Sequence, residues 1–241
     1  MTKINFSKAI VANTVTSLNI FCGFLSIVYC SEGDFRIAAI MIVVAAVFDM
    51  LDGIVARLMG TASRFGVELD SLSDVVSFGA APAFLIYKAY MYQFGFTGII
   101  LSSCLMVFGA LRLARFNIQV ENLNEKGDFK GLPIPVSAIT MALLVMSFHK
   151  DNYIIAPFDL FVIPLIIILS LLMVSHIRYN ALPKLRDKNF TWKVYLFAIL
   201  LIALVLSIWT NGVILFYIFF GIVAFGILRY LFNLLRRKRV S

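Results

Sequence analysis

The feature that most constrains the fold of this chain is a series of long apolar stretches separated by short polar segments. Hydrophobic residues make up 61% of the 241 residues and charged residues only 14%, whereas a soluble domain carries about 25% charged residues. A helix needs about 20 apolar residues to cross the hydrocarbon of a bilayer. The sequence therefore predicts an all-α, polytopic membrane helical bundle of about eight transmembrane helices. The predicted spans are residues 10–30, 35–59, 72–92, 96–116, 133–149, 156–177, 192–209 and 212–233.

The predicted helices divide into a core and an accessory part. Residues 1–180 hold the first six helices and form the membrane core in this interpretation. Residues 181–241 form an accessory two-helix hairpin that ends in a basic cytoplasmic tail.

The basic residues predict how the chain is oriented in the membrane. If the N-terminus is cytoplasmic, 18 of the 21 Lys and Arg residues fall on the cytoplasmic side, and only Arg36, Lys88 and Lys150 lie opposite. Cytoplasmic loops carry the excess of basic residues in membrane proteins. We therefore expect a multi-pass protein of the cell (inner) membrane with both termini in the cytoplasm. The net charge of +8 does not indicate nucleic acid, because the basic residues lie between apolar segments.

Four aspartates stand in or beside apolar segments where charge is costly. Asp49 and Asp52 lie near the inner end of the second predicted helix, and Asp70 and Asp74 lie near the start of the third. One Asp at the centre of a membrane helix costs roughly 2.5–3.5 kcal/mol, so four unpaired ones would cost on the order of 10 kcal/mol, comparable with the stability of a whole domain. The i, i+3 and i, i+4 spacings place each pair on one face of its helix. A short connection would let the two faces meet near the cytoplasmic surface.

Clustered carboxylates predict a metal site. Four carboxylates a few Å apart cannot all remain ionised without cations. Oxygen ligands favour Mg²⁺, Mn²⁺ or Ca²⁺ over zinc, and two such ions would suit a displacement at phosphorus. Gly53, Ala56 and Gly66 would keep the neighbouring groove open, and Arg57 is placed to hold a phosphate or to pair with an Asp. The alternative for these residues is an ion-pair network or close helix packing.

The spacing of these residues resembles the signature of the CDP-alcohol phosphotransferase family. The pattern D-x2-D-G-x2-A-R-x8-G-x3-D-x3-D runs from Asp49 to Asp74 without a departure. The resemblance implies a metal-dependent enzyme that joins a CDP-linked donor to an alcohol and releases CMP. It implies that the four aspartates bind the metals and that Asp74 is the base for the acceptor hydroxyl. The residues implied for the CDP site are Asn13, Thr16, Gly53, Ala56, Arg57 and Gly66.

Further segments are similar to one branch of this family, the integral-membrane phosphatidylserine synthases. These segments are the polar face of the first helix, the run from Arg112 to Asn117, and the loop from Gly131 to Pro135. The resemblance implies phospholipid biosynthesis, in which the phosphatidyl group of CDP-diacylglycerol passes to L-serine to give phosphatidylserine and CMP. It also implies a homodimer among membrane lipids.

Arg112, Arg115 and Asn117 are candidates for binding serine or phosphate. A guanidinium group binds a carboxylate or a phosphate with two parallel hydrogen bonds. Both arginines lie at the predicted cytoplasmic end of the fourth helix. The alternatives are that the arginines only contribute the cytoplasmic positive charge and that Asn117 only caps its helix.

Two other functions stay open at this point. The same chemistry could use another acceptor, such as glycerol-3-phosphate or inositol phosphate, although these anions would favour a more basic pocket. An Asp cluster in a membrane can also mark the path of a divalent-cation transporter. The acidic residues gather near one surface rather than across the membrane, which favours an enzyme.

Overall fold

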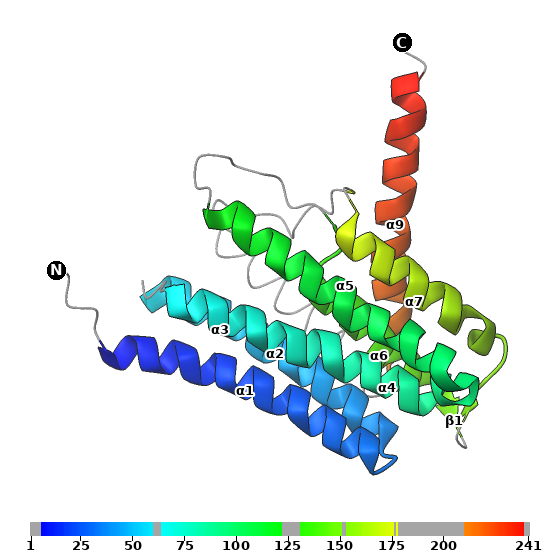
Figure 1. Ribbon diagram of the computed structural model, residues 1–241, viewed down its shortest axis with the longest axis horizontal. Coiled ribbons are helices and arrows are strands. Elements are labelled where there is room, and N and C mark those ends of the chain that lie inside the picture. The colour runs from blue at the N-terminus through cyan, green and yellow to red at the C-terminus, as the bar shows by residue number, and fades with distance from the viewer. Residues whose placement is uncertain are drawn as a thin grey trace.

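In a computed structural model, the protein is a bundle of helices (Figure 1). The structure describes residues 6–59, 64–121, 131–150, 153–175, 177 and 210–238. Most of the helices lie alongside one another, and α9 extends beyond the rest of the bundle (Figure 1). The elements are α1 (Phe6–Ser31), α2 (Phe35–Met59), α3 (Arg64–Asp74), the π-helix η1 (Val75–Ala80), α4 (Ala81–Ala89), the 3₁₀-helix η2 (Met91–Phe94), α5 (Gly95–Glu121), α6 (Ile134–Phe148), β1 (His149–Lys150), β2 (Tyr153–Ile154), α7 (Phe158–Val174) and α9 (Val213–Lys238).

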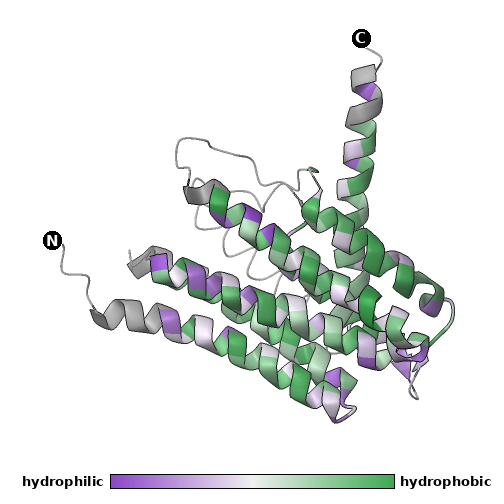
Figure 2. Cartoon of the chain, in the orientation of Figure 1, coloured by the Kyte–Doolittle hydropathy of each residue, from purple (hydrophilic) through white to green (hydrophobic). Residues whose placement is uncertain are grey.

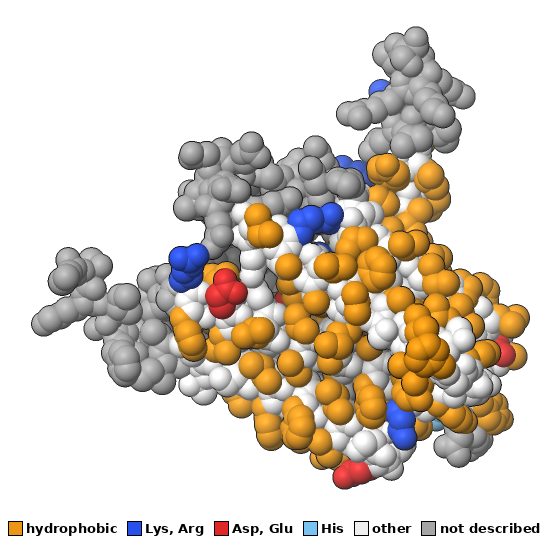
Figure 3. Space-filling model, in the orientation of Figure 1, with side chains coloured by type: hydrophobic (Ala, Val, Ile, Leu, Met, Phe, Trp, Pro, Cys, Tyr) orange, Lys and Arg blue, Asp and Glu red, His pale blue; other side chains and the backbone are white. Residues whose placement is uncertain are grey.

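Apolar helices dominate the described part of the chain, as the sequence predicts (Figure 2). Five helical segments there are long and apolar enough to cross a membrane, and α6 and α7 are shorter apolar helices. Large hydrophobic side chains remain exposed along the bundle (Figure 3), which suits a surface that faces lipid. The helical, multi-pass architecture is therefore confirmed. The predicted span at 192–209 lies outside the described residues.

A tight turn joins the first two helices. The amide of Asp34 donates to the carbonyl of Tyr29 over 2.8 Å, and the amide of Gly33 donates to the carbonyl of Cys30 over 3.2 Å. This is the Schellman pattern of a helix C-terminus, which requires a left-handed residue. Gly33 fills that position with a φ of 88°. The turn reverses the chain, so that α1 and α2 pack side by side in antiparallel directions.

The third span begins earlier than predicted and contains an irregular turn. It runs from Arg64 to Ala89, because residues 64–71, a mixture of polar and apolar side chains, form an amphipathic helix that continues into the apolar segment. The π-helix η1 lies between α3 and α4, and Pro82 comes after it in the first turn of α4. Proline lacks the amide hydrogen that an α-helix needs. Such irregular turns change the direction in which the next side chains point.

Helix α6 lies at the centre of the bundle. Most of its side chains are buried, and it packs against α2, α4 and α9, with smaller contacts to α5 and α7. Its first residue comes after a loop that is bonded to the end of α7. In that loop the amide of Gly131 donates to the carbonyl of Ile177 over 2.8 Å, and the amide of Leu132 donates to the carbonyl of Leu172 over 3.0 Å.

Contacts at the end of the bundle that contains the α1–α2 turn also hold α9 against the other helices. The Phe35 ring packs edge-on against His149 with a centroid distance of 4.7 Å, which aligns the start of α2 with the end of α6. Arg36 donates to the side chain of Asn211 over 2.7 Å, and Phe216 of α9 packs against Phe148. The two-residue strands β1 and β2 were not predicted, since four paired residues are too few to produce a periodic pattern.

Candidate active site

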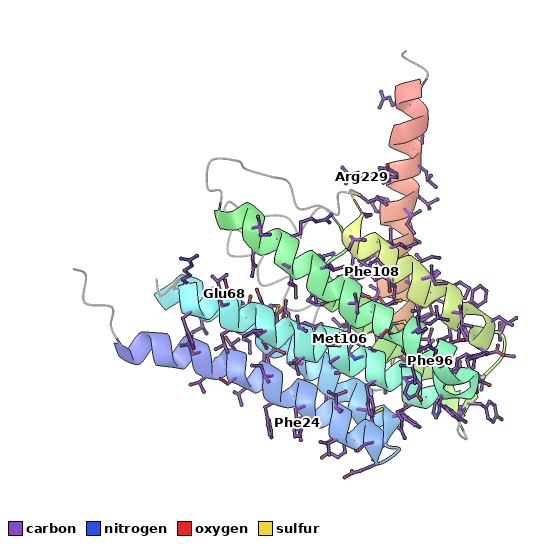
Figure 4. All side chains as sticks on the ribbon, in the orientation of Figure 1. Phe24, Glu68, Phe96, Met106, Phe108 and Arg229 are labelled. Atoms are coloured by element: carbon purple, nitrogen blue, oxygen red, sulfur yellow. The ribbon has the colours of Figure 1, made fainter. Side chains whose placement is uncertain are left out.

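Three carboxylates meet between the second and third helices. Asp49 on α2 and both Asp70 and Asp74 on α3 each offer a carboxylate oxygen, and these three oxygens all lie within 4.8 Å of one another. Asp74 is buried, with 8% of its surface exposed. The i, i+3 and i, i+4 spacings predicted that the aspartates of the two helices would face each other, and in the structure they do. Glu68, labelled on α3 in Figure 4, is exposed and does not belong to this three-carboxylate group.

Asp52 lies beside the three-carboxylate group and is held by the first helix. It is buried, with 7% exposure, and its hydrogen-bond partners are the Thr16 side chain and the Gly53 backbone. Its charge interacts with those of Asp49, Asp70 and Asp74. The fourth predicted carboxylate is therefore close to the others, although it is not one of the three that the 4.8 Å limit groups together.

Helix α1 contacts both α3 and η1 through its own backbone carbonyls. The Ser73 hydroxyl donates to the Thr16 carbonyl over 3.4 Å, and the Ser77 hydroxyl donates to the Asn19 carbonyl over 2.9 Å. Ser73 immediately precedes Asp74 in the chain. These contacts place α1, α2 and α3 around the carboxylates.

The residues predicted for the CDP site take different positions. Thr16 is buried next to Asp52, while Asn13, Gly53 and Gly66 are half-buried. Gly53 belongs to the Asp52 environment through its backbone, and Gly66 lies one turn before Asp70 on α3. The side chains of Ala56 and Arg57 lie outside the described part of the structure.

The two arginines at the end of α5 have different surroundings. Arg112 is half-buried and faces the carboxylate of Asp74 closely enough for their charges to interact. Arg115 donates through Nη1 to the carbonyl of Val174 over 3.0 Å, so it ties α5 to the end of α7. From the sequence, both arginines were candidates for the same role. In the structure, Arg112 lies near the carboxylates, whereas Arg115 bonds to the end of α7.

Asn117 connects α5 to α3 rather than standing free in the site. Its amide nitrogen donates to the Ser71 hydroxyl over 2.9 Å. Ser71 is the residue directly after Asp70, so this bond helps to fix the position of the helix that carries Asp70 and Asp74.

Asn19 is a buried polar residue that was not among the predicted site residues. Its side chain is fully buried, and neither of its amide atoms has a hydrogen-bond partner among the described residues. It lies one turn after Thr16 on α1. Because α1 and α2 are antiparallel and Thr16 meets Asp52, Asn19 lies level with Asp49, one turn before Asp52. The signal in the sequence is its position on the polar face of the first helix.

The site fits a hard divalent cation. All of its candidate ligands are carboxylate oxygens, which Mg²⁺ and Mn²⁺ prefer. One oxygen each of Asp52, Asp70 and Asp74 is buried without a hydrogen-bond partner in the part of the chain that the structure describes. A buried unpaired charge is strongly unfavourable, and Arg112 brings a single positive charge to a group of four carboxylates. A bound cation would satisfy the remaining oxygens.

Replacing Thr16 with valine is expected to weaken Mn²⁺ binding by about 10–100-fold, the usual effect of removing a group that orients a metal ligand. Valine has the same shape but lacks the hydroxyl that bonds to Asp52. A titration that monitors the electron-paramagnetic-resonance signal of free Mn²⁺ measures the affinity of the purified variant. Thr16→Ser keeps the hydroxyl and is the control. Equal affinities for the two variants would show that this hydroxyl does not orient Asp52.

Comparison with known proteins agrees with this site. Residues 9–174, more than half of the chain, match the family model for CDP-alcohol phosphatidyltransferase. The chain is 37% identical over 225 residues to the CDP-diacylglycerol–serine O-phosphatidyltransferase of Helicobacter pylori, covering 93% of this chain and 92% of that protein. It is 42% identical over 200 residues to the protein of the same name from Methanocaldococcus jannaschii, covering 82% and 84%. It is 40% identical over 168 residues to the archaetidylserine synthase of Methanothermobacter thermautotrophicus, covering 68% and 67%. This chain belongs to the CDP-alcohol phosphatidyltransferase family.

Proposed function

We propose that this protein transfers the phosphatidyl group of CDP-diacylglycerol to the hydroxyl of L-serine, giving phosphatidylserine and CMP. The observation that carries the proposal is the group formed by Asp49, Asp70 and Asp74 in a chain whose relatives bear the name of this reaction. The product is a membrane phospholipid, which suits an enzyme with several apolar helices.

The aspartates are the residues that would hold the metal. Asp49, Asp70 and Asp74, with Asp52 beside them, offer ligands for one or two divalent cations, Mg²⁺ or Mn²⁺, and Ca²⁺ fits the same donors. When bound, such a cation neutralises the diphosphate and stabilises the departing phosphate of CMP. Thr16 and the Gly53 backbone hold Asp52 in place, so that its carboxylate does not have to reorganise when the donor binds.

We infer that Asp74 acts as the general base. One of its oxygens is buried without a hydrogen-bond partner among the described residues and is available to a metal ion, which leaves the second oxygen of the carboxylate to accept the proton of the serine hydroxyl. The serine oxygen then forms a bond to the phosphatidyl phosphorus while the bond from that phosphorus to the CMP oxygen breaks. A positioned base typically contributes about 10²–10⁴-fold to the rate.

Arg112 supplies a cation next to this base. Its Nε is buried with no partner in the described chain, and its guanidinium interacts with the charge of Asp74. A planar guanidinium holds a carboxylate in one orientation. We infer that Arg112 binds the carboxylate of serine and thereby directs the hydroxyl toward Asp74. Arg115, which supports α7, and Asn117, which supports α3, act on the site indirectly.

The proposal includes a membrane arrangement. We infer eight spans, with both termini and the Asp cluster on the cytoplasmic side, because the basic residues segregate to that side. We infer a core over 1–180 and an accessory hairpin over 181–241. Homodimerisation is expected from the family resemblance, and the mass of the purified protein–detergent complex would test it.

Release of CMP by the purified protein tests the function directly. The assay supplies CDP-diacylglycerol with Mn²⁺ or Mg²⁺ and compares L-serine, glycerol-3-phosphate and no acceptor. We expect release that requires both L-serine and metal. Release that depends on glycerol-3-phosphate instead would overturn the choice of acceptor. Metal uptake into proteoliposomes without any CMP release would favour a transporter.

A further inference from the structure

Helix α1 passes unusually close to the π-helix that begins after Asp74. A Cβ atom added to Gly23 would lie 2.7 Å from the Cα atom of Ser77 and 2.9 Å from its Cβ. Carbon atoms that are not bonded pack at about 3.5–4.0 Å, so only glycine fits at this position on α1. The close approach between α1 and η1 therefore requires a glycine at position 23.

Hydrogen bonds fix the same contact along the helix axis. Ser77 donates to the carbonyl of Asn19 over 2.9 Å, and Ser73 donates to the carbonyl of Thr16 over 3.4 Å. The two serines are one turn apart, as are the two carbonyls on α1. Together with Gly23, this pair of bonds sets both the distance and the register between α1 and the segment that contains Asp74.

The π-helix begins immediately after the predicted base. Asp74 is the last residue of α3, and η1 occupies Val75–Ala80. A π-helical turn adds a residue to the helical repeat and rotates the helix on its N-terminal side relative to the helix on its C-terminal side. The position of the π-turn therefore determines how the carboxylate of Asp74 is rotated relative to α4, which is packed against α5 and α6. Ser77, the residue that contacts Gly23, lies inside this turn.

We propose that the contact between Gly23 and Ser77 is a positioning device that locks the π-turn and thereby places the Asp74 carboxylate within reach of Asp49 and Asp70. Gly23 and Ser77 are positioning residues, since they act through Asp74 and touch no substrate. The inference rests on the proposed metal-dependent function.

The test is the affinity of purified Gly23→Ala for Mn²⁺, read from the free-ion paramagnetic signal, together with kcat and KM at saturating metal. The added methyl group pushes the π-turn away from α1, and we expect affinity to fall by about 10–100-fold, as when a residue that orients a ligand is lost. We also expect kcat to fall more than the KM for serine changes. Gly79→Ala is the matched control, because it lies in the same π-turn and its Cβ would meet Met106 only at 3.5 Å or more. It should bind Mn²⁺ like the wild type.

Two further variants make the test independent of folding defects in Gly23→Ala. Ser77→Ala removes only the bond to the Asn19 carbonyl and is expected to weaken Mn²⁺ binding about two- to tenfold, the worth of one hydrogen bond. The double variant Gly23→Ala/Ser77→Gly removes the Ser77 side chain, and with it the contacts of the added methyl group to Oγ and Cβ, and should recover part of the lost affinity.

The outcomes separate this inference from the function on which it rests. Wild-type Mn²⁺ affinity in both Gly23→Ala and Ser77→Ala would overturn the positioning role while leaving the proposed function intact. An equal loss in Gly79→Ala would also overturn it, because any added methyl group in the region would then have the same effect. A wild-type protein that binds no Mn²⁺ would contradict the metal-dependent function, and the inference with it.

Discussion

Asp74→Asn is expected to reduce kcat for CMP release by about 10²–10⁴-fold, the contribution of a positioned general base. Asparagine has nearly the same shape but cannot accept the proton of the serine hydroxyl. Because the substitution also removes a charged metal ligand, the assay is run at saturating Mn²⁺, and binding of CDP-diacylglycerol is measured in parallel. Binding should persist while turnover is lost.

Glu68→Gln is the matched control for this substitution. It makes the same change from acid to amide on the same helix, at an exposed residue outside the three-carboxylate group, and should leave kcat unchanged. Normal turnover by Asp74→Asn would exclude Asp74 as the base.

Arg112→Ala is expected to raise the KM for L-serine by about 10–100-fold, with a much smaller change in the KM for CDP-diacylglycerol. A hydrogen bond to a charged group contributes about 1.5–3 kcal/mol, and each 1.4 kcal/mol is a factor of ten. Arg112→Lys keeps the charge without the planar fork and should recover only part of the affinity.

Arg115→Ala provides the contrast, because Arg115 contacts the Val174 carbonyl rather than Asp74. It should lower the temperature of thermal unfolding and change the KM for serine less than Arg112→Ala does. If Arg112→Ala raised the KM for L-serine and the KM for CDP-diacylglycerol by the same factor, that result would contradict a role of Arg112 in serine binding.

Local spacing was sufficient to predict the carboxylate cluster. Asp49, Asp52, Asp70 and Asp74 repeat at helical intervals on either side of a short connection, and charge in apolar helices is costly unless a partner such as a metal ion compensates it. The same reasoning predicted most of the helices, since apolar stretches of membrane length leave the backbone little choice but to satisfy its own hydrogen bonds.

Contacts between distant segments could not be predicted in this way. Arg112 and Arg115 are three residues apart on one helix, and only the packing of α5 against α7 decides which of them turns toward Asp74. The contact between Gly23 and Ser77, which we propose locks the π-turn, likewise joins residues that are far apart in the sequence. Neither arrangement leaves a periodic signal in the chain, because both depend on tertiary packing rather than on local preference.

The short length of α7 has a consequence for the lipid around the site. Its 17 residues rise about 25 Å at 1.5 Å each, which is less than the hydrocarbon thickness of about 30 Å. Leu160 and Leu171 are exposed on its surface, and a membrane accommodates so short a helix by local thinning, by snorkelling of flanking side chains or by association with other helices.

The C-terminal end of α7 is the end that lies nearer in depth to the carboxylates. Phe35, at the start of α2, packs against His149, which follows the end of α6. Asp49 lies as many residues after Phe35 as Ile134 lies before Phe148. The start of α6 therefore lies at the depth of Asp49. The loop before α6 is bonded to the end of α7, which places that end at a similar depth. A lipid donor bound with its diphosphate at the carboxylates would therefore have its headgroup level with the end of this short helix.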